Sequence, residues 1–199
     1  MTDQQTLRVT LIAHASTDAV RQVRFPDDEP LDRYGRAAAE AAAGRMGTGP
    51  ARCSPVRRCL ETATALGFTV NSDARLRPWQ LGAWQGLSLD ALSASDPEAV
   101  NEWLANPGSA PHGGESLAAL IDRIGRWLRA VATDGARALA VTDPTIIRAS
   151  LAHALPGGWR TFWRVDVGPL DRVTLTCNAG QWRLRALERP GTPTVPPRT

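Results

Sequence analysis

The chain contains no lysine, and all 23 of its basic residues are arginine. Mechanisms that need a Schiff-base lysine or the lysine of a P-loop are therefore excluded. The formal net charge is only +3. The arginines are scattered along the chain with no aromatic residues interleaved in a basic stripe, so the sequence does not predict a nucleic-acid partner.

Cysteine, histidine and long apolar runs are also scarce. Cys53, Cys59 and Cys177 form an odd set without metal-ligand spacing, and only three histidines accompany them, so we expect no metal site and no cofactor. No segment approaches the roughly 20 apolar residues that span a bilayer, and no secretory signal pattern opens the chain. These observations predict a cytoplasmic protein with reduced thiols and no membrane partner.

The length and composition favour one domain with a substantial core, because the chain has 199 residues, of which 43% are hydrophobic. We expect that domain to occupy residues 7–188. Residues 1–6 are polar, and residues 189–199 hold four prolines. Both ends are therefore expected to be disordered.

Apolar runs with strand character alternate with helical patterns, which predicts an α/β fold: a three-layer sandwich with a mainly parallel central sheet. A hairpin of strands 172–177 and 182–187 is expected to end the domain. The helix at 33–45 has Asp32 as its expected N-cap, and Gly67 closes the helix at 55–66. The other expected elements are strands at 7–13, 51–54, 68–71 and 137–142, and helices that begin near Ser88, Asp96, Ser116 and Pro144.

Two strand ends carry the most informative residues. His14 follows the apolar run 7–13, and Asp143 follows the similar run 138–142. Ligands of open α/β sheets bind beyond the carboxyl ends of the strands, so both side chains are placed for chemistry. Asp143 also precedes Pro144, and Asp-Pro is a common helix start. The aspartate is therefore either a helix cap alone or a cap that also serves the site.

The order of several segments resembles the histidine phosphatase superfamily, which has the phosphoglycerate-mutase-like fold. In that family the first strand ends in Arg-His-Gly, and the matching residues here are Ala13, His14 and Ala15. Thr17 matches a threonine that usually follows. The resemblance implies a phosphorylated histidine at His14.

Four later segments continue the resemblance. Residues 54–63, Ser-Pro-Val-Arg-Arg-Cys-Leu-Glu-Thr-Ala, are similar to a family block whose phosphate-gripping arginine corresponds to Arg58. Residues 76–87 resemble the block that carries the proton-donating glutamate, at which position this chain has Pro78. The other two segments, residues 112–116 and 141–148, resemble the family's Gly-Glu-Ser loop and its second-histidine block.

Three of the family's five central positions therefore differ here. Ala13 occupies the position of an arginine, Pro78 that of the acid and Asp143 that of the second histidine. Losing a preorganised donor costs on the order of 10² to 10³ in rate, and losing a general acid costs roughly 10² to 10⁴. A carboxylate at the second-histidine position also repels phosphate. These changes predict a poor phosphatase.

Other residues are candidates to complete the site. Glu115 is either a helix-capping residue or a replacement acid in the resembled Gly-Glu-Ser loop, and Arg58 and Thr17 are candidate binding residues. Trp79 and Trp84 suggest a flat or apolar ligand. Exposed tryptophans are expected at an interface if the protein forms a homodimer.

Three functions follow from this set of residues. The first is an enzyme of small-molecule metabolism, in a biosynthetic setting, that uses His14 and Asp143 for acid–base chemistry. The second is a weak or narrow phosphomonoesterase that forms phospho-His14, with Glu115 or water as acid. The third is a non-catalytic pseudophosphatase that binds a ligand or a partner.

Overall fold

A six-stranded sheet forms the centre of the fold, in the order β3-β2-β4-β1-β5-β6. The structure is a computed structural model and describes residues 6–134 and 137–190. Strands β3, β2, β4 and β1 pair in parallel, and β5 and β6 add an antiparallel hairpin beside β1. The strands are β1 (Leu7–Ala13), β2 (Pro50–Cys53), β3 (Thr69–Ser72), β4 (Ala138–Thr142), β5 (Arg172–Asn178) and β6 (Gln181–Glu188). The expected mainly parallel sheet with a terminal hairpin is confirmed.

The predicted helices are present, although two are shorter than expected, and the one expected at 55–66 spans only Arg57–Ala65. The segment expected to be helical to Arg45 leaves the helix after Ala41, and Gly44 then takes a positive φ of 75° that ends the turn. The longer helices are α2 (Arg33–Ala41), α3 (Arg57–Ala65), α4 (Leu89–Ser95), α5 (Pro97–Ala105), α6 (Leu117–Thr133) and α7 (Pro144–Ala154).

Four short elements were not predicted. They are α1 (Asp18–Arg21), α8 (Trp159–Phe162) and the 3₁₀ turns η1 (Ala74–Leu76) and η2 (Gly82–Trp84). Segments of three or four residues are too short to show a hydrophobic period, so a sequence pattern does not reveal them.

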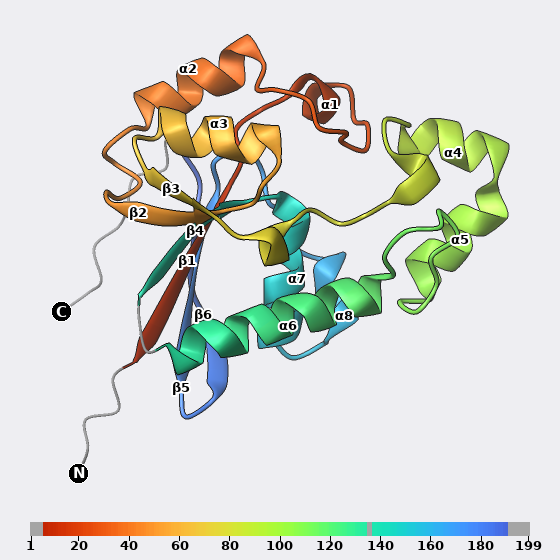
Figure 1. The fold of residues 1–199 in the computed structure, drawn as a ribbon. Coiled ribbons are helices and arrows are strands. Elements are labelled where there is room, and N and C mark those ends of the chain that lie inside the picture. Colours follow the sequence, from red (N-terminus) through yellow and green to blue (C-terminus); the bar gives the residue numbers. More distant parts are fainter. Residues whose placement is uncertain (1–5, 135–136, 191–199) are drawn as a thin grey trace.

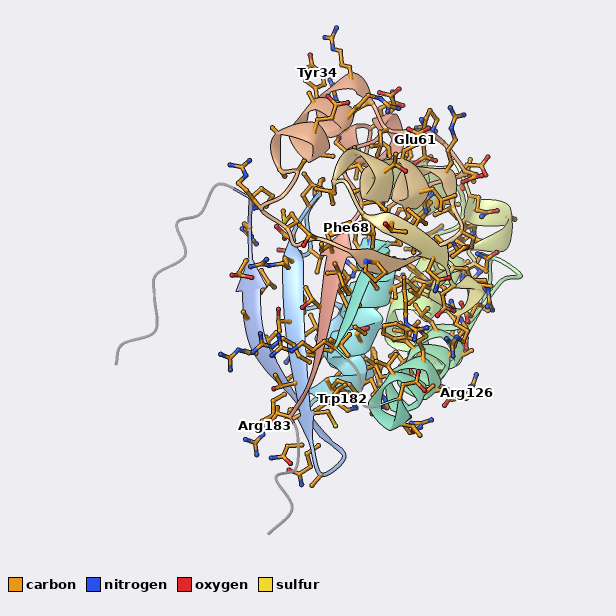
Figure 2. The ribbon with its side chains drawn as sticks, turned by 60° about the vertical axis from the view of Figure 1, so that its left-hand side comes forward. Tyr34, Glu61, Phe68, Arg126, Trp182 and Arg183 are labelled. Atoms are coloured by element: carbon orange, nitrogen blue, oxygen red, sulfur yellow. The ribbon has the colours of Figure 1, made fainter. Side chains whose placement is uncertain are left out.

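Helices cover both faces of the sheet, with α2 and α3 on one face and α6, α7 and α8 on the other (Figure 1). Figure 2 shows the same layers from the side, with Tyr34 and Glu61 on one helical layer and Arg126 on the other. In β1, Leu11 and Ala13 pack into the core beneath α6 and α7, while Ile12 packs into the core beneath α2 and α3. This alternation confirms the three-layer α/β architecture.

The described residues include no helix long and apolar enough to cross a membrane. Residues 1–5 and 191–199, for which disorder was expected, lie outside the described residues. Within residues 6–134 and 137–190, all seven tryptophans are buried or half-buried. The expectation of exposed tryptophans is therefore wrong, because the rings of Trp79, Trp84, Trp103 and Trp163 pack against one another.

Asp73, directly after β3, connects η1 and α6 to the sheet through hydrogen bonds. Its carboxylate accepts hydrogen bonds from Arg75 in η1 and from the indole nitrogen of Trp127 in α6, the latter at 3.0 Å. Burial alone would raise the pKa of Asp73, but the hydrogen bonds from Arg75 and Trp127 outweigh it and lower the pKa to about 2. The carboxylate thus favours the folded state only while it is ionised.

We expect Asp73→Asn to lower the free energy of unfolding by about 2 kcal/mol at neutral pH. The lowered pKa gives a contribution that is fully present above the ordinary carboxyl pKa of 3.8 and is lost as the pH falls toward about 2. Urea unfolding of both proteins between pH 6 and pH 2.5 measures this difference. A difference that stays constant as the pH falls would contradict the role given to the carboxylate charge.

Candidate functional site

The parallel pairing of β1 and β4 brings His14 and Asp143 together. Ala13 is the register partner of Thr142, so the next residue of each strand enters the same edge of the sheet. The backbone nitrogen of His14 donates to the carbonyl of Thr142 at 2.9 Å. His14 Nε2 lies 3.5 Å from Asp143 Oδ2, and both side chains are buried. The structure thus brings together the two residues that the strand ends singled out.

The ring of His14 is oriented by the backbone of the next residue. Its Nδ1 lies 2.7 Å from the carbonyl oxygen of Ala15. A carbonyl oxygen only accepts hydrogen bonds, so Nδ1 carries a proton and donates it. Nε2, which faces Asp143, is therefore the atom that gains or loses a proton, or that acts as a nucleophile.

Asp143 caps α7 and also belongs to the site. Its Oδ1 accepts hydrogen bonds from the backbone nitrogen of Thr145 at 2.9 Å and from the Thr145 hydroxyl at 2.6 Å. Its Oδ2 points the other way, toward His14. One carboxylate oxygen is therefore used for the helix and the other for the site.

Arg58 forms an ion pair with this same carboxylate. Its Nη2 donates to Asp143 Oδ2 at 2.9 Å, and its Nη1 donates to the backbone carbonyl of Asp27 at 2.6 Å. The guanidinium is buried, and its Nε has no hydrogen-bond partner among the described residues. Asp143 Oδ2 thus lies between Arg58 and His14, in the place where an anion held by both would lie.

The cluster of His14, Arg58 and Asp143 keeps the aspartate ionised. Burial alone would raise the pKa of Asp143, but the neighbouring His14 and the charge of Arg58 hold that pKa well below its usual range. Asp143 therefore acts as a fixed negative charge and carries no proton at neutral pH.

A small, largely apolar cavity of about 160 Å³ opens beside His14 and Asp143. Trp79 and Trp103 stack in its wall, with ring centroids 5.2 Å apart. The lining comprises His14, Val20, Phe25, Pro26, Pro78, Trp79, Leu81, Trp103, Asp143, Pro144, Thr145 and Arg148. A volume of this size accommodates roughly one six-membered ring.

Three predicted binding residues do not line this cavity. Arg58 lies behind Asp143. The buried hydroxyl of Thr17 donates to Glu29 at 3.0 Å and caps α1. Trp84 packs behind the wall, with its ring 5.4 Å from that of Trp103. Of the predicted binding residues, only Trp79 lines the cavity.

Glu115 also lies outside the cavity lining, and its carboxylate is occupied. Its two oxygens accept hydrogen bonds from Arg123 at 2.8 and 2.7 Å. Arg123 donates in addition to the backbone carbonyls of Arg75 and Arg77, which lead to Pro78. The Glu115 backbone carbonyl accepts a hydrogen bond from the indole nitrogen of Trp79 at 2.6 Å. The structure does not bring Glu115 to His14, and its role as an acid stays a prediction.

We expect Glu115→Gln to lower the free energy of unfolding by about 3 kcal/mol, because it leaves the mostly buried guanidinium of Arg123 without its charge partner. Urea unfolding at neutral pH measures the loss. Arg126→Gln, which breaks an exposed pair with Asp122 on the same helix, is the matched control and should cost less than about 1 kcal/mol. Equal losses in the two variants would contradict the structural role of the Glu115–Arg123 pair.

Sequence reasoning missed several lining residues. Thr145 and Arg148 belong to the segment that resembles the family's second-histidine block, and the helical spacing of 144, 145 and 148 could have placed them on one face of α7. Phe25 and Trp103 come from loops and helices far away in the chain, and no local pattern links them to His14.

The cysteine thiols offer no nucleophile. Cys53, Cys59 and Cys177 are buried and unpaired, and burial raises the pKa of Cys53 to about 12. Residues 6–134 and 137–190 contain no group of three or more histidine, cysteine, aspartate or glutamate side chains arranged to hold a metal ion.

Comparisons with known proteins agree with the family resemblance that the order of the sequence segments indicated. The model of the histidine phosphatase superfamily (branch 1) matches residues 9–190. The Bifunctional protein Rv2228c of Mycobacterium tuberculosis is 32% identical over 181 residues, which cover 85% of this chain and 49% of the relative. A glucosyl-3-phosphoglycerate phosphatase from the same species is 36% identical over 118 residues, covering 55% of this chain and 53% of the phosphatase. The chain spans about half the length of these curated relatives.

Solved structures share the fold. A structure named mycobacterial hydrolase 1 superposes with a TM-score of 0.77 at 28% identity, covering 91% of this chain and 97% of the other. A mycobacterial glucosyl-3-phosphoglycerate phosphatase superposes with a TM-score of 0.78 at 27% identity, covering 90% of this chain and 97% of the other.

Proposed function

Because the chain belongs to the histidine phosphatase superfamily, we propose that it is an enzyme of that fold whose site has shifted from phosphoryl transfer to proton transfer on a small molecule. One observation carries the proposal. Asp143 Oδ2 lies 2.9 Å from Arg58 Nη2 and 3.5 Å from His14 Nε2, so the protein's own carboxylate occupies the place of a bound anion.

Charge repulsion argues against efficient phosphomonoester hydrolysis. Arg58 is already neutralised by Asp143, and Ala13 supplies no guanidinium at the family's other arginine position, which leaves Arg148 as a cation that lines the cavity. A phosphate beside His14 would meet the ionised carboxylate, at a cost of up to about 4 kcal/mol per pair of charges 4 Å apart with an effective dielectric constant near 20.

The same arrangement suits general acid–base chemistry. His14 Nε2 accepts a proton from one atom of the ligand and returns it to another, while Nδ1 keeps its proton on the Ala15 carbonyl. The imidazolium formed in between faces Asp143, which stabilises its positive charge without taking the proton. The apolar walls at Trp79 and Trp103 exclude water and favour a ligand with a compact apolar body.

Deuterium exchange tests the proposal without a known substrate. The purified protein is incubated in D₂O with a metabolite extract, and mass spectrometry follows deuterium incorporated at carbon. We expect incorporation into a small molecule with the wild-type protein and its loss with His14→Asn. We expect at least a tenfold slower exchange with Asp143→Asn, since Asp143 stabilises the imidazolium. Exchange that persists in His14→Asn, or none with the wild type, would overturn the proposal.

The relatives favour a second candidate, a phosphomonoesterase of narrow specificity. Here His14 Nε2 would attack phosphorus, the ester P–O bond would break with a proton passing to the leaving oxygen, and water would cleave the P–N bond. Glu115 or water would supply the proton. Hydrolysis of p-nitrophenyl phosphate well above background, abolished in His14→Asn, would favour this function.

The cellular compartment and the metabolic role of the enzyme are part of the same proposal. Three unpaired buried thiols support a reducing compartment such as the cytoplasm. A proton-transfer enzyme acting on a compact apolar ligand also fits a place in small-molecule biosynthesis.

A further inference from the structure

Arg148 lines the cavity beside His14, and no carboxylate of the described residues pairs with its charge. It lies on α7 one helical turn after Pro144, on the face that carries Thr145. Its Nε is buried without a hydrogen-bond partner. No carboxylate oxygen of residues 6–134 and 137–190 lies within 4.0 Å of its guanidinium nitrogens. The side chain is half-buried and its Nε is removed from water without an acceptor, so a partner from outside the described residues is expected.

Two aromatic rings hold the guanidinium. The Arg148 Cζ lies 4.2 Å from the ring centroid of Phe162 and 5.8 Å from that of Trp163. A guanidinium packed against an aromatic ring has a restricted orientation and keeps the N–H groups at its edge free for a planar acceptor. This is the geometry in which arginine binds a carboxylate with two hydrogen bonds.

The charges around the cavity also leave Arg148 unmatched. Asp143, the carboxylate in the cavity lining, is already paired with Arg58. Burial lowers the pKa of Arg148, and the charges of Asp143 and Asp166 raise it without forming a direct pair. Arg148 is therefore a cation of the cavity lining that makes no direct pair with a described carboxylate, and the carboxylate of a ligand would supply one.

We propose that Arg148 binds the carboxylate of a small apolar carboxylic acid whose body occupies the cavity lined by Trp79 and Trp103. The inference rests on the proposed function and names the class of its ligand. The volume of about 160 Å³ limits the apolar body to roughly one ring or a short branched chain. A carboxylate on Arg148 leaves the rest of the molecule beside His14 Nε2.

Binding of defined probes tests the inference. Benzoate and butyrate are titrated into the protein of residues 1–199, each acid in parallel with its neutral amide. The indole N–H signal of Trp79 is followed by NMR. We expect the wild type to bind at least one acid about tenfold more tightly than its amide. In Arg148→Met, which keeps much of the aliphatic stem, this preference should vanish while the affinity for the amide stays unchanged.

A matched control separates the cavity from the general charge of the protein. Arg160→Met removes an exposed guanidinium whose Cζ lies 4.6 Å from the centroid of the Trp159 ring, and this residue does not line the cavity. The preference for the acid should survive in Arg160→Met. Its equal loss in both variants would overturn the proposal.

Other results of these experiments also test the proposal for Arg148. If neither acid binds, or if Arg148→Met lowers only the melting temperature, Arg148 serves packing and the proposal is wrong. Tighter binding of phenyl phosphate than of benzoate would assign the residue to phosphate instead. If deuterium exchange depends on His14 but not on Arg148, the proposed function stands and this inference fails. If binding of the acid depends on Arg148 but no exchange depends on His14, this inference stands and the proposed function fails.

Discussion

Asp143→His should raise the kcat/KM for p-nitrophenyl phosphate by about 10² to 10³. The substitution removes a carboxylate whose repulsion of a bound phosphate is up to about 4 kcal/mol, which corresponds to roughly three powers of ten in rate. It also frees Arg58 Nη2, now 2.9 Å from Asp143, to donate to the phosphate. Steady-state hydrolysis near neutral pH measures the effect, with inorganic phosphate as a competitive inhibitor to report on anion binding.

Asp143→Asn is the matched control for charge alone. Asparagine keeps the shape of the side chain and caps helices as well as aspartate does. It should relieve the repulsion but add no positive donor, so we expect a smaller rise, about tenfold. His14→Asn in the Asp143→His background should abolish the new activity. Efficient hydrolysis by the wild type, with no rise in Asp143→His, would show that the carboxylate does not obstruct phosphate.

The fold was predictable because its signals are local. Apolar runs located β1 and β4, and helical spacing located α6. Asp32, Ser116 and Asp143 each accept a hydrogen bond as the N-caps that their positions suggested. The pairing of His14 with Asp143 followed from one further rule, that the carboxyl ends of neighbouring parallel strands share an edge.

Close backbone approaches explain glycines in two of the resembled segments, 76–87 and 112–116. A Cβ on Gly114 would lie 2.0 Å from the carbonyl oxygen of Gln80, and one on Gly82 would lie 2.1 Å from that of His112. The segments around 80–82 and 112–114 therefore pack backbone to backbone, which only glycine permits at these positions. The motifs were visible in the sequence, although their physical reason appears only when both segments are placed.

The directions of side chains were not predictable in this way. Glu115 lies in the expected loop, yet its carboxylate turns to Arg123 on α6, eight residues along the chain. Thr17 follows His14 closely but uses its hydroxyl to cap α1. The hydrogen-bond partner of each side chain depends on competing groups from several elements, and a sequence motif does not encode this competition. The same holds for Arg58, whose partner Asp143 is 85 residues away.

Arg58→Met should lower the free energy of unfolding by about 3 to 5 kcal/mol, because it leaves the buried carboxylate of Asp143 without its cation. For a domain of this size, that loss corresponds to a fall of roughly 10 °C in the melting temperature. Arg57→Met, which breaks only an exposed pair with Glu61 on the same helix, should cost less than about 1 kcal/mol. Urea unfolding at neutral pH measures both losses.

The double variant Arg58→Met with Asp143→Ser isolates the ion pair. Serine keeps a capping oxygen for α7 but carries no charge, so the methionine no longer faces an unpaired carboxylate. We expect the double variant to be more stable than Arg58→Met alone, with a coupling energy of several kcal/mol from the mutant cycle. Additive losses would mean that Arg58 stabilises the fold through the Asp27 carbonyl and not through Asp143. In that case the carboxylate beside His14 would be free to turn away, and a phosphate could take its place.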